Sequence, residues 1–120
     1  MAKKAFSGVY SMNSFAKYAP VIIAVVRDCP SYIAKLGGYL RGVELSLIDI
    51  GIACEHLILQ AEEIGLGSCW LGWFNEKAVK EVLGLPKQKR VDILISLGYP
   101  QEEEARTKKR RTLDDIRRFV

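Results

Sequence analysis

The chain has 120 residues, enough for one domain with a core, and 49% of them are hydrophobic. Its longest apolar run, residues 19–26, is too short to cross a bilayer, and the polar N-terminus has no apolar signal core. We therefore expect a cytoplasmic protein without a membrane partner. Seven Lys/Arg and two Asp/Glu fall in residues 106–118, which leaves eleven basic and twelve acidic side chains elsewhere. This distribution argues against a nucleic-acid-binding face spread over the fold.

The first part of the chain predicts a helix end, a loop and then a strand. Residues 2–12 are interrupted by serine and glycine, which indicates a helix that runs into a loop. Pro20 opens a β-branched run over residues 21–26 that lacks alternation, and this is typical of a strand buried on both faces of a sheet. Residues 32–42 are ambiguous, since three glycines weaken any helix there.

The clearest element is a helix over residues 44–64. Apolar residues occupy almost its whole circumference, and the narrow polar strip consists of Asp49, His56, Gln60 and Glu63. A helix of this kind is expected to lie centrally in a fold or at a subunit interface. Gly65 is expected to end it in a left-handed conformation.

The later elements alternate between extended and helical patterns. Residues 67–73 predict a strand or an extended segment, and residues 91–97 predict a second strand. Between them Asn75 is expected to cap a short helix that ends at Gly84, with its inward residues being Ala78, Val79, Val82 and Leu83. Thr112 is expected to cap a last short helix. The fold class is therefore α/β (α+β). We expect one domain, with its main part over residues 1–105 and with a basic C-terminal tail and short helix over residues 106–120 as part of the same domain.

A candidate binding segment lies at residues 65–74, where glycines alternate with large flat side chains. Glycine lets a planar ligand approach the main chain, and tryptophan offers a wide apolar face. The segment follows a helix, whereas a dinucleotide fingerprint follows a strand. Two interpretations stay open from the residues alone: a pocket for a flat ligand, and a tight turn with buried tryptophans.

Few side chains are suited to acid–base or nucleophilic catalysis. His56 is the only histidine and is expected to be structural or solvent-facing. Asp49 and Glu55 do not share a helix face well enough to act as a carboxylate pair. Cys69 has no nearby base in sequence, so inert packing is expected, and the three cysteines are expected to be reduced. No spacing indicates a metal site.

The basic run in residues 106–111 has two interpretations. It can be a solvated tail, or it can bind a phosphate, for which arginine offers a bidentate fork and lysine a point charge. Nucleic-acid binding through the tail is disfavoured, because no aromatic residues interleave with the basic ones.

Six segments taken in order resemble the FMN-dependent nitroreductase family. They are Ala19-Pro20-Val21-Ile22-Ile23, Asp49-Ile50-Gly51-Ile52-Ala53, Gly65-Leu66-Gly67-Ser68-Cys69-Trp70-Leu71-Gly72, Glu81-Val82-Leu83-Gly84-Leu85-Pro86, Leu97-Gly98-Tyr99-Pro100 and the basic tail before Leu113. The resemblance covers the later part of the family pattern. The family's Arg/Ser-rich N-terminal segment and its Asn and Pro-Trp region have no counterpart here, and His56 stands where asparagine is common.

The resemblance implies a sheet layered by helices in an intertwined homodimer, with FMN at the subunit interface. It implies that Trp70, Leu71 and Gly72 lie against the flavin ring, with a backbone N–H near Gly72 directed at flavin N5. It also implies that Lys108 and Arg110 hold the FMN phosphate. The expected function is an NAD(P)H oxidoreductase that reduces nitroaromatics, quinones or similar small acceptors, with the chemistry carried by the flavin and no side chain assigned as catalytic. The alternative is a truncated, catalytically impaired paralogue that acts as a dimeric flavin-binding or interaction module.

Overall fold

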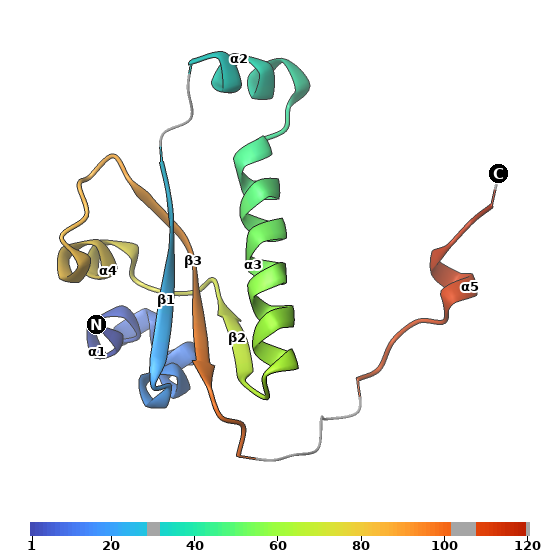
Figure 1. Ribbon diagram of the computed structural model, residues 1–120. Coiled ribbons are helices and arrows are strands. Elements are labelled where there is room, and N and C mark those ends of the chain that lie inside the picture. Colours follow the sequence, from blue (N-terminus) through green and yellow to red (C-terminus); the bar gives the residue numbers. More distant parts are fainter. Residues whose placement is uncertain (29–31, 102–107, 120) are drawn as a thin grey trace.

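The computed structural model describes residues 1–28, 32–101 and 108–119 (Figure 1). The elements in chain order are α1 (Ala2–Ala5), the 3₁₀ segment η1 (Gly8–Tyr18), β1 (Val21–Arg27), α2 (Tyr32–Arg41), α3 (Leu45–Glu63), β2 (Gly67–Leu71), α4 (Glu76–Leu83), β3 (Arg90–Gly98) and α5 (Leu113–Ile116). This mixture of helices and strands confirms the expected class. Within the described residues, no helix is both long enough and apolar enough to cross a membrane.

The three strands form one antiparallel sheet in the order β1-β3-β2. The β1–β3 ladder runs from Val21↔Leu97 to Arg27↔Arg90, and the β2–β3 ladder runs from Gly67↔Gly98 to Leu71↔Leu94. The last strand in sequence therefore lies between the other two. β1 is half-exposed along most of its length, so the expectation of a strand buried on both faces is wrong for this chain.

A bulge in β3 decides which of its side chains reach the core. Val25 pairs with Ile93, but Val26 pairs with Val91, so Asp92 is an extra residue without a partner on β1. Val91 and Leu94 are three positions apart, and an odd separation normally places two side chains of a strand on opposite faces of the sheet. Because Asp92 is the extra residue between them, their side chains lie on the same face, and both enter the same buried cluster.

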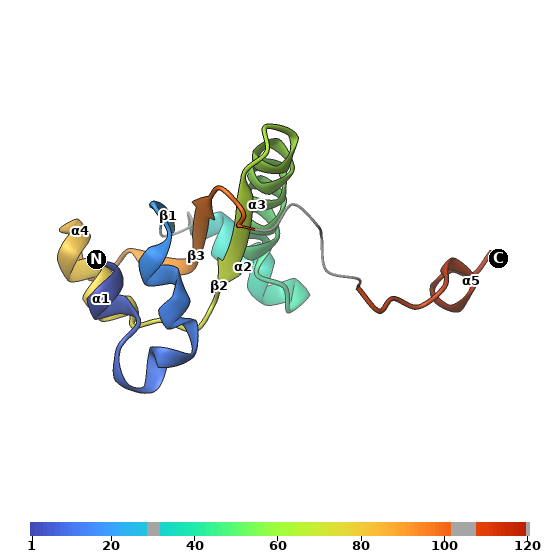
Figure 2. The same cartoon turned by 90° about the horizontal axis from the view of Figure 1, so that it is seen from below.

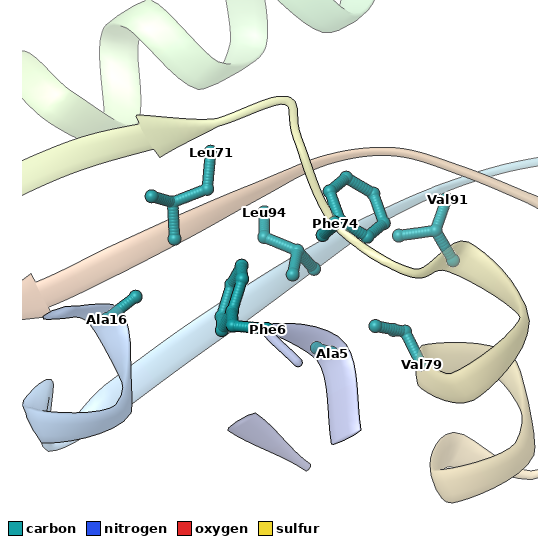
Figure 3. Close-up of a cluster of buried hydrophobic side chains, with 8 residues drawn as sticks. All are labelled: Ala5, Phe6, Ala16, Leu71, Phe74, Val79, Val91 and Leu94. Atoms are coloured by element: carbon teal, nitrogen blue, oxygen red, sulfur yellow. The ribbon is translucent and has the colours of Figure 1, made fainter. Parts of the chain in front are cut away.

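That cluster is the main core, and it lies between the sheet and the N-terminal helical segments (Figure 3). Its members come from α1, η1, β2, β3, α4 and the turns beside them: Ala5, Phe6, Ala16, Leu71, Phe74, Val79, Val91 and Leu94. Figure 2 shows α1 and α4 on this side of the sheet, with α3 on the other. The N-terminal residues, for which the sequence predicts a helix end that runs into a loop, therefore supply part of the core.

Helix α3 covers the second face with only a narrow part of its surface. Cys54 and Ala61 are its buried residues. A row of apolar side chains on its outer side is exposed, and we call it the outer stripe: Leu45, Ile48, Ile52 and Leu59. Spacings of three, four and seven residues place the outer stripe on one helix face. The sequence left two positions open for this helix, the centre of the fold or a subunit interface. Its exposed outer stripe shows that it does not lie at the centre of the single chain.

The helix ends agree with the sequence patterns. Gly65 has φ +78°, and Gly84 has φ +64° after α4, so both occupy the left-handed region that glycine adopts without strain. Asn75 Oδ1 accepts a hydrogen bond from Ala78 N–H at 3.1 Å. Thr112 forms a capping box with Asp115 at the start of α5. In α4, however, Val79 is buried but Val82 and Leu83 are exposed, so its inward face is narrower than expected.

A charged network connects β1, β3 and the start of α3. Arg27 donates two hydrogen bonds to the carboxylate of Asp92, from Nε at 2.8 Å and from Nη2 at 2.9 Å. Its Nη1 donates to Ser46 Oγ at 3.0 Å and also pairs with Glu44. The bulged residue Asp92 thus provides the bidentate partner that fixes this arginine.

A second charged contact fixes α4 on the sheet through Glu76. Its carboxylate accepts from Val91 N–H at 3.0 Å, and it pairs with Lys80 Nζ at 3.0 Å and Arg90 Nε at 3.1 Å. Partial burial raises the pKa of Glu76, but the hydrogen bonds from Val91 and Lys80 and the nearby positive charges outweigh that effect and leave the pKa below its usual value.

Replacement of Glu76 by glutamine should lower the free energy of unfolding at pH 7 by about 1 kcal/mol. Because the folded-state pKa is depressed, the carboxylate stabilises the fold above its unfolded pKa of about 4.3 and loses that effect as the pH falls through the folded value. Urea unfolding between pH 7 and pH 3 should therefore show the wild type and Glu76→Gln converging in acid. The exposed Glu81→Gln variant is the control, and a difference between wild type and Glu76→Gln that is constant with pH would contradict the assignment.

Candidate functional site

The candidate site begins at the end of β2, where two neighbouring side chains point to opposite faces of the sheet. Leu71 is buried in the core and pairs with Leu94. Trp70 pairs with Ile95 on the face toward α3 and is 41% exposed. Leu71 can therefore offer a ligand only its main chain, whereas Trp70 offers part of an aromatic face.

Gly72 follows directly and leaves its backbone open. Its N–H donates no hydrogen bond within the described part of the chain, although main-chain N–H groups are usually paired. A Cβ at this position would approach Ile93 Cδ1 at 3.7 Å, which is an ordinary contact. An exposed indole beside an open backbone donor is a combination that fits the edge and face of a planar heterocycle.

The turn after Gly72 is held by the N-terminal segment. Trp73 Nε1 donates to Val9 O at 2.9 Å, Asn13 Nδ2 donates to Trp73 O at 3.0 Å, and the rings of Tyr10 and Trp73 lie 5.7 Å apart. These contacts join residues sixty or more positions apart, and no local pattern predicts them. Tyr10 and Asn13 are thus positioning residues that reasoning from the sequence missed.

The tail cations lie apart from this segment. Lys108 and Arg110 are exposed and precede α5, which stands away from the sheet and from α3 in both views (Figures 1 and 2). The structure therefore brings Trp70, Leu71 and Gly72 together but does not bring the two tail residues to them within one chain. Leu113, Ile116 and Phe119, the apolar residues of the tail that the structure describes, are also exposed.

The remaining candidates form no catalytic group. His56 is exposed on α3, with Nδ1 2.9 Å from Ile52 O, and Asp49 and Glu55 are exposed on the same helix. Cys54 is buried, which raises the pKa of its thiol, and Cys69 is half-buried; both are free thiols. Cys29 lies outside the described residues. In the parts of the chain that the structure describes, no three His, Cys, Asp or Glu side chains gather as a metal site.

The fold and this segment define a member of a known family. The model of the nitroreductase family matches residues 4–99, and the chain belongs to that family. A protein of Archaeoglobus fulgidus, provisionally named as an NADH dehydrogenase/NAD(P)H nitroreductase, is 40% identical over 105 residues, which are 84% of this chain and 56% of that protein.

Two solved structures from clostridia support the same assignment. The nitroreductase family protein of Clostridium novyi NT is 33% identical with a TM-score of 0.66, and the match covers 87% of this chain and 56% of that one. The FMN-dependent nitroreductase of Clostridium difficile R20291 is 30% identical with a TM-score of 0.56, over 82% of this chain and 54% of that one. The chain thus spans about half the length of the curated relatives that it matches.

Proposed function

We propose that the chain acts in an FMN-dependent NAD(P)H oxidoreductase that reduces nitroaromatics, quinones or similar small acceptors. The observation that carries the proposal is the open Gly72 N–H beside the exposed Trp70, at the end of a strand in a nitroreductase-family fold. The names of the relatives support it, since they include an NADPH-flavin oxidoreductase of Vibrio harveyi and an FMN-dependent nitroreductase. The cytoplasm is the proposed location.

Each proposed binding residue has a separate task. The indole of Trp70 packs on the flat ring system, and the Gly72 N–H donates to a ring nitrogen, where it stabilises negative charge. Leu71 fixes this main chain because its own side chain is anchored in the core. Lys108 and Arg110 bind the phosphate. When bound, FMN supplies the two-electron transfer from NAD(P)H to the acceptor, which is consistent with the lack of a catalytic side-chain group in the described residues.

We further propose that the working unit is an intertwined homodimer. The chain has an accessible surface of 9814 Å², against about 6,500 Å² for a compact monomer of its mass. The outer stripe of α3 and the apolar residues of the tail contribute to that excess. Because the tail stands away from its own β2, we propose that Lys108 and Arg110 of one subunit serve the Trp70–Gly72 segment of the partner subunit (Figure 1).

A second candidate function is a dimeric interaction module that binds flavin weakly or not at all. The separation of the tail cations from the Trp70–Gly72 segment in one chain favours it (Figures 1 and 2). The two proposals differ in one measurement, because a stable dimer that is indifferent to FMN would support the interaction module.

The test is an FMN titration of the purified chain, followed by absorbance, together with NADH and NADPH oxidation in the presence of nitrofurazone or menadione. We expect saturable binding and acceptor-dependent turnover. Trp70→Ala should weaken FMN binding about tenfold through loss of ring contact, and Trp70→Phe should keep most of the affinity. Absence of bound flavin at saturating FMN would overturn the enzymatic proposal.

A further inference from the structure

The turn between β2 and α4 is tied to the N-terminal segment at three points. At the far end of the turn, Asn75 N–H donates a hydrogen bond to Ala5 O at 3.0 Å. Nearer to β2, Trp73 Nε1 donates to Val9 O at 2.9 Å, and Asn13 Nδ2 donates to Trp73 O at 3.0 Å. The N-terminal segment therefore follows the turn along its length and holds both its main chain and a side chain.

The residues of this turn differ in how much else holds them in place. Phe74 is buried in the main core, and Asn75 caps α4 by accepting a hydrogen bond from Ala78 N–H. Trp73 is 54% exposed and lies outside the core cluster, although its ring contacts that of Tyr10. The position of Trp73 therefore depends on the N-terminal segment more than the positions of its neighbours do.

Gly72 lies between one firmly held residue and Trp73. On its N-terminal side, Leu71 is buried and is the last residue of the β2–β3 ladder. Gly72 itself is exposed, has no side chain to anchor it, and as a glycine has more backbone freedom than other residues. Its N–H can keep one direction only if the chain is also held on the C-terminal side. The contacts of Trp73 provide that second restraint.

Asn13 is the residue that restrains the main chain of Trp73. It lies at a kink within η1, with φ −98° and ψ 23°, where the helical geometry is interrupted. Ala16, in the same segment, is buried in the core and anchors this segment on the sheet. A hydrogen bond from an amide to a carbonyl oxygen is directional, so the bond from Asn13 sets the orientation of the Trp73 carbonyl. The bond to Val9 restrains only the indole.

We propose that Asn13 is a positioning residue for the flavin site, which keeps the Gly72 N–H in its ligand-binding direction by restraining the Trp73 carbonyl. The inference rests on the proposed function, in which this N–H donates to a nitrogen of the flavin ring. Asn13 needs no contact with the flavin to act in this way. A donor that is already oriented loses less conformational freedom when the ligand binds, so loss of Asn13 should weaken binding without removing a binding group.

Two variants at Asn13 separate hydrogen bonding from shape and charge. Asn13→Asp keeps the shape of the side chain, but an ionised carboxylate cannot donate to Trp73 O. Asn13→Ala removes the donor without adding a charge. The matched control is Ser11→Asp, which adds the same charge at an exposed position of the same segment. Circular dichroism checks that each variant folds, and Asn13→Ala decides the case if Asn13→Asp does not fold.

The first measurement needs no flavin. The amide signal of Gly72 is followed by heteronuclear NMR in the full chain and in each variant. We expect both Asn13 variants to shift and broaden this signal, because the peptide group then exchanges between orientations. Ser11→Asp should leave the signal as it is in the wild type. An unchanged Gly72 signal in both Asn13 variants would overturn the inference.

The second measurement uses bound FMN. Both Asn13 variants should bind FMN about fivefold more weakly, which corresponds to the loss of one ordinary hydrogen bond. The reduction potential of the bound flavin should also fall, because the Gly72 N–H stabilises negative charge on the ring. A fivefold smaller preference for the reduced form corresponds to about 20 mV in a two-electron couple. A role of Asn13 in stability alone would leave the potential of the bound flavin unchanged.

The outcomes separate this inference from the proposed function. Weaker FMN binding with a lowered potential, confined to the Asn13 variants, would support the positioning role. Wild-type affinity and potential in both Asn13 variants would overturn the inference and leave the proposed function standing, and so would equal losses in Ser11→Asp. Failure of the wild type to bind FMN at saturating concentrations would overturn both.

Discussion

Replacement of Phe6 by alanine should lower the free energy of unfolding by about 3–5 kcal/mol. Phe6 is fully buried, and it is the largest fully buried side chain in the described residues. Figure 3 shows it between η1, β3 and α1, within the main core. The loss of its ring would remove contacts with several elements at once and leave a cavity that the sheet cannot close. Urea denaturation followed by circular dichroism measures the change.

Phe15→Ala is the matched control, because the same ring is removed from the same N-terminal segment. Phe15 is 52% exposed, so its loss should cost about 1 kcal/mol or less. Equal destabilisation by the two variants would show that the N-terminal segment is not anchored through Phe6.

The double replacement Lys108→Ala/Arg110→Ala should weaken FMN binding by roughly a hundredfold or more. A charge-assisted contact to a phosphate is worth roughly tenfold to a hundredfold in a dissociation constant, and two such contacts would be lost. The matched control is Lys109→Ala/Arg111→Ala, which removes the same charge from neighbouring positions in the basic run. Fluorescence quenching of FMN measures both. Equal weakening in the two variants would indicate general attraction by the tail, and no specific phosphate site.

A mixing experiment tests whether the tail acts on the partner subunit. Two variants are mixed, and each alters a different part of the proposed site. Trp70→Ala removes the contact with the ring, and Lys108→Ala/Arg110→Ala removes the contacts with the phosphate. If the tail serves the partner, every mixed dimer has one intact site and one doubly altered site. Random exchange of equal amounts should then restore tight FMN binding in about one quarter of the sites. No restoration after exchange would place the cations in their own subunit's site.

Much of the fold could be predicted from the sequence, because its signals are local. The long helix, its glycine end, the Asn75 cap and the two later strands follow from periodicity and from residues with special backbone or capping preferences. The role of the N-terminal residues could not be predicted. The sequence indicates a helix end followed by a loop, but the contacts that order these residues, such as the hydrogen bond from Asn13 to Trp73, come from residues sixty positions away.

The candidate site was predictable only in part, for a different reason. The alternation of glycine and tryptophan marks the end of β2, and the open Gly72 N–H agrees with that interpretation. The roles of Lys108 and Arg110 remain predictions, since they depend on how two copies of the chain meet.

The extra residue at Asp92 also protects the sheet against misalignment. β3 is the middle strand of the sheet. If β3 shifted by two residues along its neighbours, its side chains would still point to the same faces, so without the bulge such a shift would cost little free energy. The bulge, however, exists at one position only, and there the Asp92 carboxylate meets both nitrogens of Arg27 that form the bidentate pair. A slipped strand would remove the bidentate partner of Arg27, leaving it only Glu44 and Ser46, and would move Val91 out of the core. The Asp92–Arg27 pair therefore favours one register of β3 over the slipped alternative.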